Sequence, residues 1–171
     1  MLVGNPYQFA VIAKIVSDWN QNDITPFYNG VLLICIDGQL FPKHISTATL
    51  GVDIPYLEKA LSNIAINGGL FKMVKEKAFL EIYKATFPSL EDIECGVNEN
   101  YRYCLSPQSL SDCDCIIFAV SDGKQVRILA ADLKYVKEES THDLNNIDII
   151  ETFIMPEEIE KISCELEKVL E

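Results

Sequence analysis

Three cysteines lie close together in the sequence and could supply thiolate ligands to a metal. They are Cys104, Cys113 and Cys115, with Cys95 and His142 as further candidates nearby. Structural zinc sites usually combine a Cys-x₂₋₄-Cys pair with a second pair of Cys or His at similar spacing. Only one residue separates Cys113 from Cys115, and on a strand that spacing directs both side chains to one face. We therefore expect packing rather than zinc, and keep a metal-binding or regulatory domain built on this cluster as the alternative.

Groups suited to acid–base or nucleophilic catalysis are sparse. The chain has two histidines, His44 after a proline in a predicted turn and His142 in a polar segment, and neither belongs to a nucleophile-and-base motif. Glycine-rich phosphate-binding motifs do not occur in the sequence. Asp112 and Asp114 could exchange a proton or bind a cation, but carboxylates in a turn are more often solvated. We expect no enzymatic activity and no cofactor; an enzyme with dispersed catalytic residues is the third hypothesis.

The strongest chemical signal is an uneven surplus of acidic residues. The chain has 26 Asp+Glu against 14 Lys+Arg, a formal net charge of −12. Residues 138–171 contain 11 acidic residues and 2 lysines, a net charge of −9, and residues 89–100 contain four acidic residues and no Lys or Arg. Such a surface repels nucleic acid and anionic lipid and attracts a basic protein. Alternatively, the acidity only aids solubility.

Candidate partner-binding residues follow from this surplus, at acidic positions in predicted loops and turns. We assign contact with a basic partner to Glu91, Asp92, Glu94, Glu99, Asp112 and Asp114.

The length and composition of the chain predict the kind of fold that positions these residues. At 171 residues, 49% of them apolar, the chain suits one globular domain, 1–171, with a sizeable core. The first residues lack a basic region, and Asn5-Pro6 interrupts the apolar stretch that a signal peptide would need. The longest apolar runs, 30–36 and 116–120, are far shorter than the roughly 20 residues that cross a bilayer. We expect a cytoplasmic protein with unpaired cysteines, and Cys35 and Cys164 buried as small apolar residues.

The first half of the chain predicts a hairpin followed by two helices. Residues 7–19 favour a strand, and 30–36 form an apolar strand that ends at Asp37-Gly38, a hairpin signal, with a return strand over 39–41. Asp53 is the predicted N-cap of a helix with Pro55 in its first turn, which Asn67-Gly68-Gly69 should end. A second helix is predicted over 75–86, so that the two form a helical hairpin.

The second half predicts four strands and a final helix. The strands are expected over 101–105, 115–120, 124–131 and 147–155, with a Ser/Asp-rich turn at 106–114, a hairpin at Asp122-Gly123 and a polar loop over 138–146. Pro156, Glu157 and Glu158 suit the first turn of a helix, and an apolar stripe follows at Ile159, Ile162, Leu166 and Val169. The fold class is α+β, a mostly antiparallel sheet with the helical hairpin and this amphipathic helix packed on it.

The order of several segments resembles the immunity protein 42 family of bacterial polymorphic toxin systems. The similar segments are Val3-Gly4-Asn5-Pro6-Tyr7-Gln8-Phe9-Ala10-Val11-Ile12, Asn29-Gly30 with Ile36-Asp37-Gly38, Ser46-Thr47-Ala48-Thr49-Leu50, Tyr101-Arg102-Tyr103-Cys104-Leu105-Ser106-Pro107, and Phe118-Ala119-Val120-Ser121-Asp122-Gly123 with Val126-Arg127-Ile128-Leu129. These are turns, hairpins and buried strands rather than catalytic motifs.

The resemblance implies an immunity protein that binds and neutralises a cognate bacterial toxin stoichiometrically, without chemistry of its own. It implies toxin systems of secretion or contact-dependent growth inhibition. A nuclease is one candidate toxin, since its Lys and Arg residues hold phosphate and would meet the acidic surface. Interface residues do not transfer within such a family, because each member must discriminate its own toxin.

Overall fold

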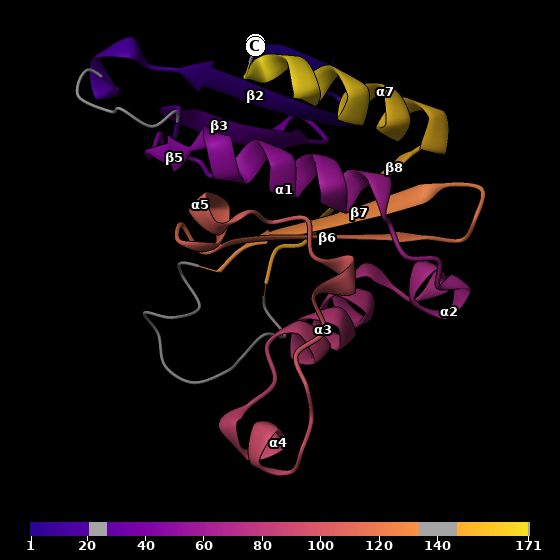
Figure 1. The fold of residues 1–171 in the computed structure, drawn as a ribbon. Coiled ribbons are helices and arrows are strands. Elements are labelled where there is room, and N and C mark those ends of the chain that lie inside the picture. The colour runs from indigo at the N-terminus through magenta and orange to yellow at the C-terminus, as the bar shows by residue number, and fades with distance from the viewer. Residues whose placement is uncertain (21–26, 134–146, 171) are drawn as a thin grey trace.

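The computed structural model describes residues 1–20, 27–133 and 147–170, which form two antiparallel sheets with helices packed on them (Figure 1). The first sheet has the order β1-β2-β3-β4, with a short β5 also paired to β3, and the second has the order β6-β7-β8. The strands are β1 (Leu2–Asn5), β2 (Phe9–Ile15), β3 (Asn29–Ile36), β4 (Gln39–Phe41), β5 (Ala48–Thr49), β6 (Cys115–Ser121), β7 (Val126–Asp132) and β8 (Ile150–Ile154). The predicted α+β class is confirmed, with two sheets where one was expected. The predicted loop 138–146, with His142, lies outside the described residues.

Both predicted Asp-Gly hairpins are confirmed. Asp37 and Gly38 adopt φ angles of 48° and 76° between β3 and β4, a conformation that Asp tolerates and Gly adopts freely. In the turn between β6 and β7, the Asp122 carboxylate accepts hydrogen bonds from the backbone N–H groups of Lys124 and Gln125 at 2.8 and 2.9 Å. These bonds lower the pKa of Asp122.

Helices cover both sheets. Their bounds are α1 (Leu50–Ser62), α2 (Gly68–Lys72), α3 (Lys75–Thr86), α4 (Leu90–Glu94), α5 (Gln108–Ser111) and α7 (Pro156–Leu166), with 3-10 turns η1 (Ser17–Trp19), η2 (Tyr101–Tyr103) and η4 (Glu167–Val169). The predicted helix over 75–86 coincides with α3, and the predicted C-terminal helix with α7.

Two apolar clusters lie on opposite faces of the second sheet. Along β6, Cys115, Ile117 and Ala119 belong to a cluster with α1, α7 and the first sheet. The alternate residues Ile116, Phe118 and Val120 belong to a second cluster with α3 and Tyr103. Because β6 is buried on both faces, its sequence is a continuous apolar run rather than an alternating one.

The predicted helical hairpin is wrong, because its two helices pack in different clusters. Helix α1 packs against α7 and β3, and its Ile54, Leu57 and Leu61 lie in the first cluster. Helix α3 packs against β7 and η2, and places Phe79 and Ile82 in the second cluster. The two helices are therefore held on opposite sides of the second sheet (Figure 1).

The start of α1 differs from the prediction. The helix begins at Leu50, and Asp53 is a buried residue inside it rather than its N-cap. The backbone N–H groups of Leu50 and Gly51 donate to the carbonyl groups of Tyr28 and Phe27. Because the chain before β3 accepts these hydrogen bonds, no side-chain cap is needed. The helix then ends at Ser62.

Two further local predictions are wrong. Asn67 begins a helix instead of ending one, since its side chain accepts hydrogen bonds from the N–H groups of Gly69 and Leu70 at the start of α2. In place of the strand predicted over 101–105, Tyr101–Tyr103 form the 3-10 turn η2, in which the Asn100 side chain accepts from the Arg102 N–H, and Cys104 forms an isolated bridge with Phe118.

Helix α7 confirms its predicted apolar stripe and corrects one residue beside it. Ile159, Ile162 and Leu166 are buried, but Cys164, predicted to be buried, is exposed. Ser163 takes the inward position, and its hydroxyl lies 2.9 Å from that of Ser62 on α1. In the described part of the chain, no helix is both long and apolar enough to cross a membrane.

Candidate functional site

Four of the six predicted partner-binding residues lie on one excursion of the chain, residues 89–100, here called the α4 segment. Glu91, Asp92, Glu94 and Glu99 are all exposed. The segment leaves from the end of α3 and returns at Asn100, whose N–H donates to the Ala85 carbonyl at 2.9 Å. Figure 1 shows it projecting beyond α3, on the side away from the first sheet. The acidic residues therefore share a protruding surface.

A capping box fixes the start of α4. The Ser89 hydroxyl accepts a hydrogen bond from the Asp92 N–H at 3.2 Å, and an Asp92 carboxylate oxygen accepts from the Ser89 N–H at 3.1 Å. The Ser89 hydroxyl and N–H also hold the pKa of Asp92 below its usual value. The Asp92 carboxylate is thus held in a defined position at the start of α4.

Apolar side chains lie beside these carboxylates, although the sequence reading missed them. Leu90 is 80% exposed, Ile93 45% and Val97 46%. Single exposed apolar residues need no explanation, but three within eight residues of a protruding segment form a patch suited to a protein partner. The sequence did contain a pattern that predicts this patch: Leu90 and Ile93 are three residues apart, a spacing that places two side chains on one face of a helix.

The remaining two predicted residues lie elsewhere, at the entry to β6. Asp112 is exposed and accepts a hydrogen bond from the Gln108 side-chain amide at 2.6 Å. Asp114 adopts a φ of 59°, and its backbone carbonyl accepts from the Leu133 N–H at 2.8 Å. The structure therefore divides the six candidates between the α4 segment and the α5–β6 turn (Figure 1).

The three clustered cysteines do not converge. Cys104 lies in the apolar cluster on one face of β6 and Cys115 in the cluster on the other. Cys113 precedes the strand, and its thiol lies 3.2 Å from the Ser46 hydroxyl. Cys113 also packs against the cluster that contains Cys115, so these two cysteines lie on one side as predicted, and Cys104 lies on the other. Burial raises the pKa of Cys104, and that of Cys115 to about 12, which disfavours the thiolate that a metal would need.

Other potential catalytic or metal-binding groups are dispersed. His44 is exposed in the connection between β4 and β5. Across residues 1–20, 27–133 and 147–170, no group of three or more His, Cys, Asp or Glu side chains is placed to hold a metal ion.

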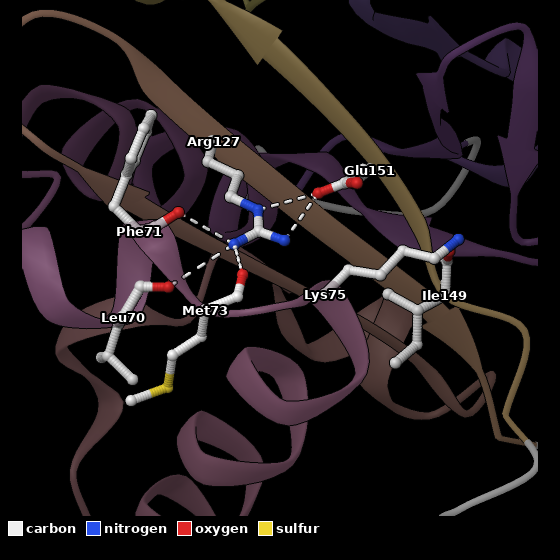
Figure 2. A network of polar contacts seen from close by, with 7 residues as sticks. All are labelled: Leu70, Phe71, Met73, Lys75, Arg127, Ile149 and Glu151. Carbon is white, nitrogen blue, oxygen red and sulfur yellow. Dashed lines mark hydrogen bonds and ion pairs between the residues drawn. The ribbon is translucent and has the colours of Figure 1, made fainter.

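One buried polar network, centred on Arg127 of β7, was not predicted from the sequence. Arg127 is 3% exposed, and its guanidinium pairs with Glu151 of β8 through Nε at 2.8 Å and Nη2 at 2.7 Å (Figure 2). Its Nη1 donates to the carbonyl groups that end α2: those of Leu70 at 3.5 Å, Phe71 at 3.0 Å and Met73 at 2.6 Å.

A neighbouring lysine extends this network. Lys75, at the start of α3, donates from Nζ to the Ile149 carbonyl at 2.7 Å (Figure 2). The two cations tie α2 and α3 to β7 and the chain entering β8, by hydrogen bonds to backbone carbonyls. The network therefore acts as a structural tether between these elements.

Comparison with known proteins identifies the family to which this chain belongs. The sequence matches the family described as immunity protein 42 over residues 1–169. The chain belongs to the immunity protein 42 family. The resemblance read from the sequence is confirmed, and the protein is an immunity protein.

A solved structure shares the fold of this immunity protein. The chain is similar to CdiI from Burkholderia dolosa AUO158, with a TM-score of 0.76 and 23% sequence identity over 98% of this chain and 99% of that one. No curated protein sequence matches the chain. The family match and the shared fold each extend over nearly the whole length of the chain.

Proposed function

We propose that this immunity protein is a single cytoplasmic domain that neutralises one cognate toxin by binding it in a one-to-one complex, without catalysing a reaction. The observation that carries the proposal is the family match over residues 1–169. The similarity to CdiI supports a toxin of contact-dependent growth inhibition. The net charge of −12 supports a basic toxin, with a nuclease as the first class to test.

The α4 segment is the contact surface that we favour. It joins three exposed apolar residues to four exposed carboxylates and carries no Lys or Arg. Protein interfaces combine an apolar centre with a polar rim, and the acidic rim would select a basic toxin surface and speed the encounter with it. Asp112 and Asp114 remain candidates for a second contact region.

Co-expression tests the function directly. The immunity protein is produced together with the toxin domain encoded next to it, and cell survival and co-purification are scored. Survival with a stable one-to-one complex supports the proposal. Toxicity that persists although the immunity protein is soluble and folded contradicts it.

Substitutions on the α4 segment then test the surface. Leu90→Ser combined with Ile93→Ser should weaken the complex at least about tenfold, as expected when exposed apolar anchors leave an interface. The matched control is Val74→Ser, which removes a comparably exposed apolar residue (67%) outside the segment. Equal affinities for the α4 variant and the wild type, both with unchanged melting temperatures, would place the interface elsewhere.

A further inference from the structure

A pocket lined by both polar and apolar side chains lies between the start of α1 and α5, away from the α4 segment. Its volume is about 590 Å³, within the range of binding sites for side chains and small ligands. One wall comes from the chain around β5 and the first turn of α1, and the other from α5 and the turn after it. Its polar lining includes the hydroxyl groups of Ser46, Thr47, Thr49 and Ser109 and the carboxylates of Asp53 and Asp112.

Two buried side-chain atoms of this pocket, Asp53 Oδ2 and the Ser109 hydroxyl oxygen, have no hydrogen-bond partner among the described residues. Asp53 is only 2% exposed, and its other carboxylate oxygen, Oδ1, accepts a hydrogen bond from the Ser109 N–H at 3.5 Å. Buried polar atoms are nearly always paired, because an unpaired one loses its hydration without compensation. Oδ2 therefore lacks the donor that its position calls for.

The electrostatic surroundings of Asp53 reinforce this need. Burial raises the pKa of Asp53; the nearby Ser109 hydroxyl and the backbone groups of Ser109 and Thr49 oppose the shift, and the charge of Asp112 adds to it. Asp112 is exposed and also lines the pocket, and none of the described lining residues is a Lys, Arg or His. Two carboxylates thus share a pocket that contains no compensating cation.

We propose that this pocket receives a basic side chain of the cognate toxin, an Arg guanidinium or a Lys ammonium group. The inference rests on the proposed function and names a second point of contact within it. The incoming cation would pair with Asp112 at the exposed rim and donate to Asp53 at the buried wall. Phe27 and Val52 supply apolar surface for the methylene stem of such a side chain.

An organic cation fits this site better than a metal ion. Metal sites need three or more converging ligands of suitable type, and the described residues contain no such group here. A guanidinium group needs only one or two carboxylates together with neutral acceptors, and the surrounding hydroxyl oxygens supply the latter.

The test measures affinity for the cognate toxin domain in purified variants of the full chain. Asp53→Asn should weaken the complex about 30-fold or more, and Asp112→Asn about threefold to tenfold, because the buried partner of a charge pair contributes more than an exposed one. Val52→Trp, at a 54% exposed position on the pocket wall, should weaken binding by occupying the space without changing the charge. Glu76→Gln removes an equal charge from the exposed start of α3 and should leave affinity within about twofold.

The outcomes separate this inference from the function on which it rests. If the wild type binds its toxin while Asp112→Asn and Val52→Trp, both at exposed positions, bind equally well, the pocket is not an interface and the inference fails alone. A wild type that forms no toxin complex overturns the proposed function as well. Melting temperatures identify any loss caused by misfolding of Asp53→Asn, and the Asp112 and Val52 variants then decide the result.

Discussion

At the scale of single residues, the most consequential side chain is Arg127. A buried guanidinium is stable only when its donors are paired, and here one carboxylate and three carbonyl groups accept from it. Its Cζ also lies 5.8 Å from the centre of the Phe153 ring. These contacts join β7, β8 and the end of α2, so that one side chain holds three elements together.

Replacing this residue should destabilise the protein strongly. Arg127→Met leaves Glu151 without its partner and three carbonyl groups without a donor, and should lower the free energy of unfolding by about 3 kcal/mol. Arg102→Met is the control, since Arg102 is exposed and its guanidinium lies over the Tyr103 ring; this change should cost about 1 kcal/mol at most. Urea denaturation measures both. Equal stability of Arg127→Met and the wild type would show that the network contributes no net stability.

The cysteines should differ in reactivity according to their burial. Cys95 and Cys164 are exposed, whereas Cys35, Cys104 and Cys115 are buried with raised pKa values, that of Cys115 reaching about 12. The thiolate is the reactive form, so at pH 8 the exposed pair should be alkylated first. Pulsed iodoacetamide labelling with mass spectrometry measures the order. Native Cys115 reacting as fast as Cys164 would contradict the packing described.

The same shifts imply a stability limit at high pH. In the unfolded chain a thiol ionises near its ordinary pKa of 9.0, while burial keeps Cys115 protonated in the fold up to about 12. The folded state therefore binds more protons than the unfolded state between these values, and stability falls as the pH rises above about 9.

At the scale of elements, close backbone approach explains one glycine of the family segments. Gly30 lies in β3, paired with Ile15 of β2. A Cβ atom there would overlap the Lys14 carbonyl oxygen and lie 2.7 Å from Leu50 Cδ1, at the start of α1. Glycine at this position thus lets β2, β3 and α1 meet.

Gly30→Ala should therefore disrupt the first sheet. Backbone atoms cannot yield as a flexible side chain can, so we expect a loss of about 2–3 kcal/mol of unfolding free energy. Gly68→Ala is the matched control: it lies at the first position of α2 with open space around its Cα and should be neutral or slightly stabilising. Chemical denaturation compares the two. Similar stabilities for both variants would refute the steric argument.

At the scale of the whole molecule, charge is the property most relevant to a partner. Screening weakens exposed charges beyond roughly 8 Å at physiological ionic strength, so a protein of charge −12 should meet a basic toxin faster in low salt. The α4 segment itself contains four acidic residues and no Lys or Arg. The contribution of these charges to the association rate can be measured separately from the affinity.

Charge reversal of the α4 segment should slow association. Glu91→Lys, Asp92→Lys and Glu94→Lys together should reduce the association rate constant about tenfold at low salt and flatten its dependence on ionic strength. Reversal of Glu157, Glu158 and Glu160 on α7 changes the net charge equally and serves as the control. Stopped-flow or surface-binding kinetics measure the rates. Indistinguishable rates for the two triple variants would leave net charge, and not this segment, as the cause.

The sequence by itself determined the features that depend on neighbouring residues. The Asp-Gly pairs specify turns because these residues accept positive φ angles, and Pro156 with Glu157 and Glu158 specifies the start of α7. The continuous apolar run of β6 and the exposed acidic residues of the α4 segment were readable for the same reason. The family resemblance also rested on these local determinants.

Tertiary structure alone decided which surfaces meet. Arg127 alternates along β7 with the apolar residues Val126 and Ile128, yet it is buried because the end of α2 covers its face of the strand. Asp53 reads as a helix cap, yet hydrogen bonds from Leu50 and Gly51 to residues 27–28 begin the helix earlier and bury the carboxylate beside α5. Contacts between segments far apart in the chain set these outcomes, and a pattern within one segment carries no information about what will pack against it.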